Sequence, residues 1–409
     1  MENNKTPKIR FKGFTDPWEQ RKLSEIALQT YGGGTPKTAN EEFWKGNIPW
    51  IQSSDLIEER LFNVKPRKYI SQEAISKSST KLVPQNSIAI VTRVGVGKLA
   101  FMPFSYATSQ DFLSLSVLKI EPEFAVYALY KMMRLVSNEV QGTSIKGITK
   151  DELLAKEILI PDCDEQKKIG AYLHNLDNLI TLHQRKYNKL LNVKKSMLEK
   201  MFPKNGSNIP EIRFKGFTDP WEQRKFNELV IIERGGSPRP IDKFITNDVN
   251  GLNWVKIGDA PQQGNYITKT AEKIIPEGLS KTREVHPGDL ILSNSMSFGK
   301  PYIMAINGCI HDGWLLIRDT NKVFDLKFLC QMLGTEQMLS QYKALAAGST
   351  VNNLNKELVG NTNVTVPNIK EQQQIGEYFS NLDSLITLHQ RELEKLQNIK
   401  KSMLEKMFV

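Results

Sequence analysis

Cysteine is scarce in this chain: among 409 residues only Cys163, Cys309 and Cys330 occur, and no two form a CxxC pair. This count excludes a disulfide framework and a four-cysteine zinc site, and sparse thiols are typical of a reducing cytoplasm. The five histidines are scattered, without an HExxH motif. No run of about eighteen apolar residues occurs, so no membrane span is expected. The polar start lacks the apolar core of a signal peptide, and a cytoplasmic protein is predicted.

Charge and composition are those of a globular protein with a basic balance. The 55 Lys and Arg against 45 Asp and Glu give a net charge of +10. An anionic partner such as nucleic acid is weakly favoured by this balance. Hydrophobic residues make up 40% of the chain, which excludes disordered and collagen-like classes. The length predicts two or more domains.

The chain is an internal repeat. The segment IRFKGFTDPWEQRK occupies residues 9–22 and again 212–225, and residues 165–202 match 371–408 at 27 of 38 positions. The interiors, 23–164 and 226–370, have similar lengths but different sequences. They share only landmarks such as GGTP against GGSP, and Asp111 set against Asp312. The ends therefore share one task, whereas each interior has its own.

The repeated ends predict two long helices. Apolar residues recur at alternate steps of four and three, and no proline interrupts either segment. Asp162 or Asp164 in one copy, and Asn368 in the other, are candidate N-caps. We expect the two stripes to pair as antiparallel coiled-coil helices; the alternative is that each helix packs on its own domain only. His183 and His389 fall in the stripe as seam residues. The predicted seam consists of Ile169, Leu173, Leu176, Ile180, Leu190, Met197, Ile375, Phe379, Leu382, Ile386, Leu396 and Met403.

Each interior is predicted to be an α+β module. Strands are expected at 87–92, 111–118 and 158–160 in the first copy, and at 289–293, 313–317 and 364–366 in the second. Helices are expected around 123–140 and 325–346. Trp50, Trp254 and Trp314 are expected in the cores rather than as stacking platforms.

Three motifs suggest catalysis and fail on comparison of the two copies. Residues 95–100 match GxGxxA, but the second copy keeps only Gly299, so a flexible loop is predicted. Pro161-Asp162 with Glu165-Gln-Lys167 resembles a PD…ExK nuclease motif. The second copy reads Pro367-Asn368 with Glu371-Gln-Gln373, and so it lacks both the Asp and the Lys. Asp16-Pro-Trp18 and Asp219-Pro-Trp221 come near the (N/D)PP(F/Y/W) motif of amino-methyltransferases, but both lack its second proline. We therefore predict no catalytic residues and no metal site, although spacing alone excludes no serine triad.

The opening RFKGFTDPWEQRKL, the GGTP loop and the EQ-x-x-IG…LHQR…KMF helix, each arranged twice, resemble the specificity subunit of type I restriction–modification systems. The resemblance covers nearly the whole chain. It implies two target-recognition domains that each read half of a bipartite, asymmetric double-stranded DNA site. It further implies that the helices set the spacer and dock two modification subunits with adenine-N6 methyltransferase activity. Restriction subunits complete the complex, and S-adenosylmethionine, ATP and Mg²⁺ are expected on the partners, with no cofactor on this chain.

On this reading the recognition domains are residues 1–162 and 211–368, the helices 163–202 and 369–409, and the linker 203–210. Polar loop tips at equivalent places are the candidates for DNA contact, since phosphate contacts position a protein and base contacts specify sequence. They are Thr35, Lys37, Gln52, Ser53, Ser54, Arg93, Lys98, Ser109, Gln110, Lys146, Ser237, Arg239, Lys256, Asp259, Asn294, Ser297, Lys300 and His311. Two alternatives stay open: a protein-binding scaffold without DNA readout, and a stand-alone DNA enzyme.

Overall fold

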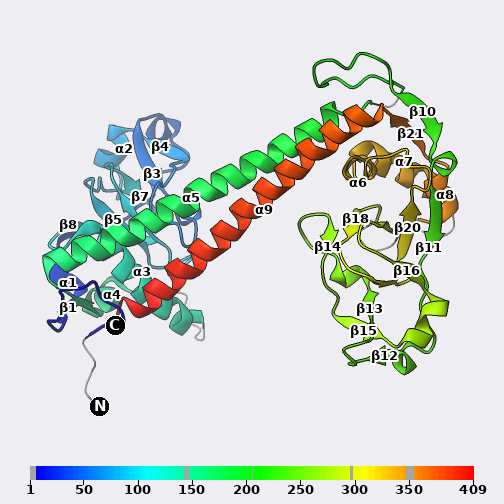
Figure 1. Cartoon of the computed structure of the whole chain (residues 1–409). Helices are drawn as coiled ribbons and strands as arrows, with labels where there is room; N and C mark the ends of the chain where they lie inside the picture. Colours follow the sequence, from blue (N-terminus) through cyan, green and yellow to red (C-terminus); the bar gives the residue numbers. More distant parts are fainter. Residues whose placement is uncertain (1–5, 142–146, 205, 295–297, 347–353) are drawn as a thin grey trace. The chain divides into compact units, whose positions relative to one another are not determined.

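A computed structural model describes residues 6–141, 147–204, 206–294, 298–346 and 354–409. The chain divides into two compact units (Figure 1). The first unit comprises residues 1–182 with 393–409, and the second comprises residues 183–392. Each unit holds one module, which we call module 1 (residues 6–162) and module 2 (residues 211–368), together with part of both long helices. The boundaries expected from the sequence treat each long helix as a segment separate from the recognition domains. These boundaries stay predictions.

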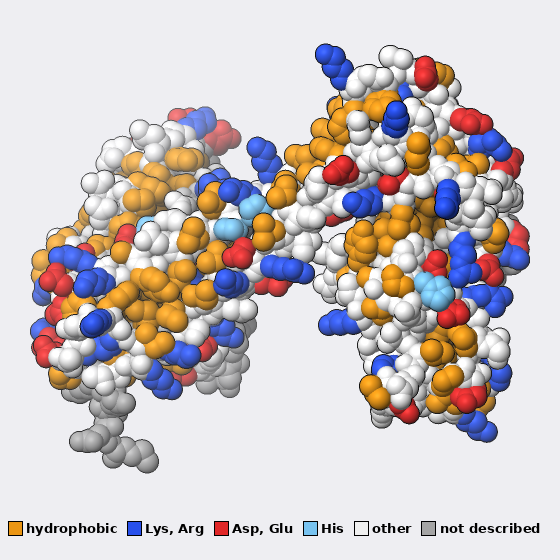
Figure 2. Space-filling view, in the orientation of Figure 1, with side chains coloured by type: hydrophobic (Ala, Val, Ile, Leu, Met, Phe, Trp, Pro, Cys, Tyr) orange, Lys and Arg blue, Asp and Glu red, His pale blue; other side chains and the backbone are white. Residues whose placement is uncertain are grey.

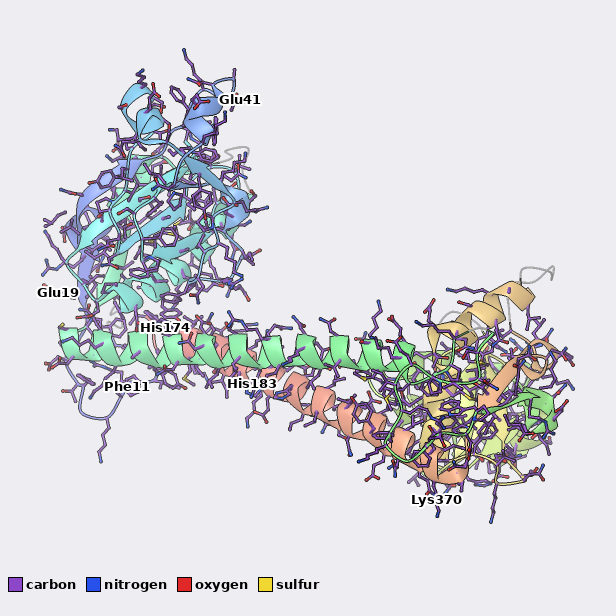
Figure 3. All side chains as sticks on the ribbon, turned by 90° about the horizontal axis from the view of Figure 1, so that it is seen from above. Phe11, Glu19, Glu41, His174, His183 and Lys370 are labelled. Atoms are coloured by element: carbon purple, nitrogen blue, oxygen red, sulfur yellow. The ribbon has the colours of Figure 1, made fainter. Side chains whose placement is uncertain are left out.

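Module 1 contains two sheets. The first has the strand order β2 (Ala27–Gly32), β8 (Phe112–Leu118), β5 (Ser87–Val91) and β6 (Leu99–Met102), and the second has β4 (Lys68–Ile70), β3 (Ile48–Ile51) and β7 (Ala107–Thr108). A separate antiparallel pair joins β1 (Glu19–Lys22) to β9 (Glu157–Ile160). The helices are α1 (Leu23–Ile26), α2 (Gln72–Lys77), α3 (Pro122–Gln141) and α4 (Lys150–Ala155), with short turns η1 (Glu41–Trp44) and η2 (Ser53–Asp55). Figure 3 shows Glu41 at the end of module 1 that lies away from the long helix, whereas Phe11 lies next to it.

Strand β5 is apolar on both faces because both faces are covered. Ile88 and Ile90 pack into the cluster that contains α3, whereas Ala89 and Val91 pack into the cluster shared with the second sheet. A strand that is buried on both faces reads as a continuous apolar run rather than an alternation. This explains why residues 87–92 were recognisable as a strand.

Module 2 repeats this plan. One sheet has the order β11 (Ile231–Arg234), β20 (Trp314–Arg318), β17 (Leu290–Ser293), β18 (Pro301–Met304) and β14 (Tyr266–Ile267). The other has β12 (Ile245–Thr246), β15 (Glu272–Ile274), β13 (Leu252–Val255), β19 (Gly308–Ile310) and β16 (Arg283–Val285). Strand β10 (Glu222–Lys225) pairs with β21 (Asn363–Val366). The helices are α6 (Leu326–Leu333), α7 (Glu336–Ala346) and α8 (Lys356–Gly360), with turns η3 (Phe226–Glu228), η4 (Ile241–Lys243), η5 (Ile257–Asp259) and η6 (Pro276–Lys281).

The long helices are α5 (Cys163–Lys200) and α9 (Ile369–Lys406), green and red in Figure 1. Asp162 Oδ1 accepts the Glu165 amide at 3.0 Å and Asn368 Oδ1 accepts the Glu371 amide at 3.0 Å, so Asp162 and Asn368 are the caps. In each unit the helix segments run antiparallel, which confirms the α+β fold with two antiparallel long helices. Lys194 and Lys400 lie at equivalent positions of the two stripes and form ion pairs between the helices: Lys194 contacts Asp383 and Lys400 contacts Asp177, each at 2.5 Å.

The residues of the predicted seam divide between two kinds of packing. Leu173 and Leu176 lie in the core of module 1, where Leu396 and Met403 also pack. Ile375, Phe379 and Leu382 lie in the core of module 2 together with Leu190 and Met197. Ile169 lies in the module 1 core, Ile180 is half-buried and Ile386 is buried. Each helix therefore packs both on a module and on the other helix. His183 and His389 face each other, with their Nδ1 atoms 3.2 Å apart.

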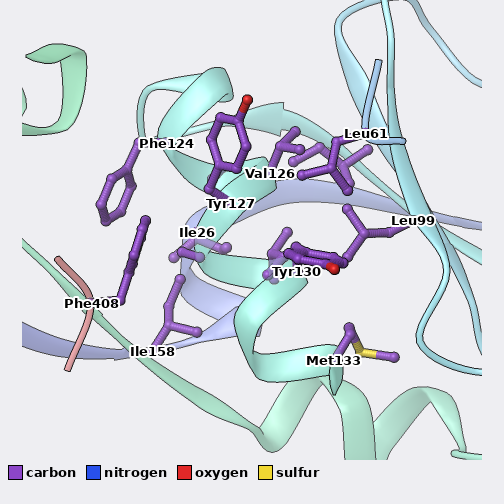
Figure 4. Packing of buried hydrophobic residues seen from close by; sticks show 14 of the residues in the cluster. Ile26, Leu61, Leu99, Phe124, Val126, Tyr127, Tyr130, Met133, Ile158 and Phe408 are labelled. Atoms are coloured by element: carbon purple, nitrogen blue, oxygen red, sulfur yellow. The ribbon is translucent and has the colours of Figure 1, made fainter. Parts of the chain in front are cut away.

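The end of each long helix docks at the base of a module. In the first unit, Phe408 stacks on Phe124 with ring centroids 5.5 Å apart, and Trp18 contacts both rings at their edges. Figure 4 shows Phe408 face to face with Phe124. In the second unit, Phe202 stacks on Phe328 at 5.5 Å and Trp221 contacts both.

The fourteen-residue opening repeat packs on the module that follows it. Arg10 forms a two-pronged ion pair with buried Glu165, at 2.9 and 2.7 Å. Arg213 repeats this pair with Glu371 at 2.8 and 2.7 Å. The sequence left open whether the opening packs on its own module or the other one, and the structure assigns it to its own.

Most expected elements are present. The helical region expected around 325–346 consists of two short helices, because Gly334 ends α6 and the Thr335 hydroxyl accepts the Met338 amide at the start of α7. Trp50, Trp254 and Trp314 are buried, as predicted. Residues 95–98 form a turn with Gly95 and Gly97 at positive φ, which confirms a loop in place of a dinucleotide-binding helix.

Candidate nucleic-acid interface

The predicted DNA-contacting residues of module 1 gather where several strands end. Gly32 at the end of β2 pairs with Leu113, and Val91 at the end of β5 pairs with Phe112 at the start of β8. Strand β7 runs parallel to β3, and the chain then continues through residues 109–111 into β8. The loops that carry Thr35, Gln52, Arg93 and Gln110 therefore leave one edge, which both sheets share. We call it the strand-end edge.

Module 2 has the same edge. Arg234 at the end of β11 pairs with Leu315, and Ser293 at the end of β17 pairs with Trp314 at the start of β20. Strand β19 runs parallel to β13 and leads through residues 311–313 into β20. The loops that carry Ser237, Lys256, Asn294 and His311 leave this edge.

The double glycines of the GGTP and GGSP loops let two loops of the edge touch. A Cβ atom on Gly33 would lie 1.8 Å from the Ser109 carbonyl oxygen, and one on Gly235 would lie 2.2 Å from that of His311. Real side chains never approach backbone this closely, so each position requires glycine. The glycines therefore fix the Thr35 and Ser237 loops against the 109–111 and 311–313 loops.

A hydroxyl joins these two loops in both modules. The Thr35 hydroxyl donates to Gln110 Oε1 at 2.6 Å, and the Ser237 hydroxyl donates to Asp312 Oδ1 at 2.9 Å. The sequence landmark that set Asp111 against Asp312 is wrong by one residue. Gly33 donates to the Phe112 carbonyl and Gly235 to that of Trp314, so Gln110 is the counterpart of Asp312. An alignment of the two sequences could not show that Gln110 and Asp312 are equivalent, because the residues around them differ between the modules.

Several candidates hold the edge together rather than project from it. Asp259 accepts the Lys256 amide at 2.8 Å and the Ala271 amide at 2.9 Å through its two carboxylate oxygens. Asn294 is buried and donates to the Asp312 carbonyl at 2.8 Å. Ser109 is buried and donates to Asp111 at 3.2 Å. The base contacts expected of these three side chains stay predictions, and their packing gives each a structural role.

Four candidates of module 2 line one open hollow of about 640 Å³: Ser237, Arg239, Lys256 and His311. Two basic side chains line this hollow. Lys256 forms an ion pair with Glu272, whereas Arg239 forms no ion pair with any described residue. Burial lowers the pKa of His311, against the opposing effect of Asp312. The His311 Nδ1 atom has two close neighbours: the Gly313 amide donates to it at 2.9 Å, and Asp312 Oδ1 lies 2.9 Å from it.

The remaining candidates vary in exposure. Lys37, Ser54 and Arg93 are exposed, and Gln52, Ser53, Lys98 and Lys300 are half-buried. The Lys300 ammonium lies 5.0 Å from the centre of the Tyr302 ring. Lys146 and Ser297 lie outside the described residues. On the visible face, Figure 2 shows basic and acidic side chains interspersed on both units, so the +10 charge forms no single field there.

The sequence reasoning missed two features of the edge. Asp312 was noted only as a landmark, although its side chain sits where Gln110 was proposed as a reader. Lys68 lies 5.6 Å from the centre of the Trp44 ring and 5.7 Å from that of Trp50. The sequence signal for Lys68 was its place in a short strand, two residues before the buried Ile70.

Neither a metal centre nor a membrane span is evident in the described part of the chain. No group of three or more His, Cys, Asp or Glu side chains in those residues could hold a metal ion. No helix found there is both long and apolar enough to cross a bilayer. Glu165, from the apparent nuclease motif, is buried in its pair with Arg10. The helix-capping interpretation of that motif is therefore correct for Asp162 and its surroundings.

Two copies of one α+β module, each packed on segments of two long antiparallel helices, define a protein of two similar domains. The family described as "Type I restriction modification DNA specificity domain" matches residues 15–192 and again residues 218–398. The chain therefore belongs to the family of type I restriction–modification specificity subunits, with the specificity domain present twice.

Individual relatives agree with this assignment. The MjaIX specificity subunit of Methanocaldococcus jannaschii is 26% identical over 244 residues, 56% of this chain and 55% of the relative. The EcoR124I/EcoR124II specificity subunit of Escherichia coli is 32% identical over 170 residues, 39% of this chain and 41% of the relative. These alignments cover about half or less of either relative. A crystal structure of the type I restriction–modification S subunit from M. genitalium shares the fold, with a TM-score of 0.60, 16% identity and 99% coverage of both chains.

Proposed function

We propose that this chain is the non-catalytic DNA-specificity subunit of a type I restriction–modification complex. Each module reads one half of a bipartite, asymmetric site on double-stranded DNA. One observation carries the proposal: the same strand-end edge occurs twice, on the same frame of loops, with different polar side chains. Two similar frames with different tips suit two different half-sites, because base-edge contacts depend on side-chain chemistry.

The long helices fix the spacer and dock two modification subunits. The repeat places the same exposed leucines on both helices: Leu179 and Leu182 on α5 are 44% and 46% exposed, and Leu385 and Leu388 on α9 are 45% and 52% exposed. Repeated exposed apolar side chains are typical of a protein-binding face. Two equal faces suit two copies of one partner.

The chemistry then belongs to the partners. Modification subunits carry adenine-N6 methylation with S-adenosylmethionine, and restriction subunits carry ATP- and Mg²⁺-dependent cleavage. This chain supplies recognition in the cytoplasm and binds no cofactor itself. The purified chain alone should be inert towards DNA with either S-adenosylmethionine or Mg²⁺. Turnover by the chain alone would favour a stand-alone enzyme.

The stoichiometry of the complex tests the docking faces. The Leu182→Lys variant should bind one modification subunit, Leu388→Lys should also bind one, and the double variant should bind none. Native mass spectrometry reads the number directly. Lys195→Ala and Lys401→Ala alter exposed positions at equal places in the repeat and serve as matched controls. Two bound subunits in the double variant would show that the leucines are not the docking face.

A further inference from the structure

We propose that Gln110 and Asp312 occupy one and the same base-reading position of the two modules, and that Thr35 and Ser237 hold them in place. This inference rests on the proposed function and names side chains that read each half-site. Gln110 presents an amide and Asp312 a carboxylate in the same frame. Module 1 therefore selects an adenine at this position and module 2 a cytosine.

The equivalence of the two positions follows from backbone hydrogen bonds. In module 1, the Gly33 amide donates to the Phe112 carbonyl and the Gly34 amide to the Thr108 carbonyl. In module 2, the Gly235 amide donates to the Trp314 carbonyl and the Gly236 amide to the Ile310 carbonyl. In each module, three residues lie between the two carbonyl groups that accept these hydrogen bonds. Gln110 and Asp312 are the central residues of these equivalent loops.

Each reading side chain is held from the opposite loop. The Thr35 hydroxyl donates to one oxygen of Gln110 at 2.6 Å, and the Ser237 hydroxyl donates to one oxygen of Asp312 at 2.9 Å. The same Asp312 oxygen lies 2.9 Å from His311 Nδ1. A proline follows each hydroxyl residue and restricts its backbone. A side chain that is fixed before binding loses less conformational entropy when it contacts DNA.

The atoms left over differ in chemistry. Gln110 is exposed and keeps its Nε2 donors, together with the second lone pair of Oε1. The Asp312 side chain is 34% exposed, and its Oδ2 has no hydrogen bond to any described residue. Glutamine pairs with adenine N6 and N7, whereas aspartate accepts from the N4 amino group of cytosine. A carboxylate also repels the acceptor edge of guanine, which strengthens the choice.

Selection from a DNA library tests the pair. The full chain, assembled with its modification subunits, is incubated with duplexes randomised at both half-sites, and the bound DNA is sequenced. The Asp312→Asn variant, which is isosteric, should lose the preference for cytosine at one position of one half-site by about 10- to 100-fold. The other half-site should not change. Gln110→Glu should produce the converse result, with adenine lost at one position of the other half-site.

The holding hydroxyls provide an independent readout. Ser237→Ala should weaken discrimination at the Asp312 position without a change in the preferred base, and Thr35→Ala should do the same at the Gln110 position. Thr35→Ser keeps the hydroxyl and should behave as the unmodified chain. If Asp312→Asn does not fold, Ser237→Ala decides the assignment.

Three results separate the outcomes. Unchanged preferences at both half-sites in Asp312→Asn, or loss of all sequence preference with unchanged thermal unfolding, would overturn the proposed reading position. A change in both half-sites at once would also overturn it. If the unmodified complex selects no bipartite sequence at all, the proposed function itself fails, whatever the variants do.

Discussion

The bases of the two modules and their strand-end edges have diverged to very different degrees. At the bases, Phe408 on Phe124 and Phe202 on Phe328 have the same centroid distance, 5.5 Å, and the Arg10–Glu165 and Arg213–Glu371 pairs have the same shortest contact, 2.7 Å. At the edges, the hydroxyl-held side chain is an amide in one module and a carboxylate in the other.

This difference separates two kinds of constraint. Side chains at the bases meet the same protein surface in both units, so any change would create a cavity or an unpaired charge. The backbone frame of the edges is retained by glycine contacts, while the side chains on it are free to differ. The specificity of the two modules can therefore diverge without loss of the common fold.

The largest expected effect lies at the bases. Phe408→Ala and Phe202→Ala should each destabilise the affected unit by about 3–5 kcal/mol, because each removes a buried aromatic ring from a packed cluster. The two losses should be alike if the bases are equivalent. Hydrogen exchange by mass spectrometry localises the change: module 1 for Phe408→Ala and module 2 for Phe202→Ala. Swapped or global exchange would contradict the separate docking of the two ends.

The buried ion pairs should come next. Glu165→Gln and Glu371→Gln should each reduce the free energy of unfolding by about 3 kcal/mol, because Arg10 or Arg213 then keeps a charge with almost no access to water. Urea denaturation measures the loss. Replacement of both partners, as in Arg10→Met with Glu165→Met, should restore part of it. A double variant that is less stable than either single one would argue against the unpaired charge as the cause.

A smaller effect should distinguish the two bases. Trp18 Nε1 donates to Glu165 at 3.2 Å, whereas the buried Trp221 Nε1 has no hydrogen-bond partner among the described residues. Trp18→Phe should therefore lower stability by about 1 kcal/mol more than Trp221→Phe, the value of one hydrogen bond. Thermal unfolding of the two variants under identical conditions provides the comparison. Equal losses would mean that this hydrogen bond contributes nothing to stability.

Of the two strand-end edges, only that of module 2 should respond to mild acid. Burial lowers the pKa of His311 below its ordinary 6.5, so the unfolded chain binds more protons near that pH and stability falls as pH falls through it. Protonation also removes the Nδ1 acceptor of the Gly313 amide. It places a positive charge 2.9 Å from Asp312 Oδ1, the oxygen that the Ser237 hydroxyl contacts. The counterpart residue Ser109 does not titrate.

DNA selection at about pH 7.5 and about pH 5.5 checks this expectation, since the change spans the ordinary histidine pKa. Discrimination should weaken at the half-site of module 2 and persist at that of module 1. The His311→Asn variant, which keeps a neutral acceptor, should lose the pH dependence. An equal loss at both half-sites would point to a general effect of acid rather than to His311.

The helices and strands could be predicted from the sequence better than the side-chain arrangement at the strand-end edges. The helices could be predicted because the apolar stripe keeps one period over 38 positions. The strands could be predicted because residues 88–91 and 290–292 are apolar and buried on both faces. The Asp312 position was not readable, since equivalence there depends on backbone hydrogen bonds between distant loops. The structural roles of Asp259 and Asn294 were hidden for the same reason: their partners are backbone groups.

The bipartite site itself is the most direct test. A single-molecule methylome should be measured in cells that express this chain with a cognate modification subunit, and in cells with the modification subunit alone. We predict a new bipartite motif, with N6-methyladenine on both strands, in the first cells only. The absence of any new motif, from a complex shown to be assembled, would contradict the account and favour a scaffold without DNA readout.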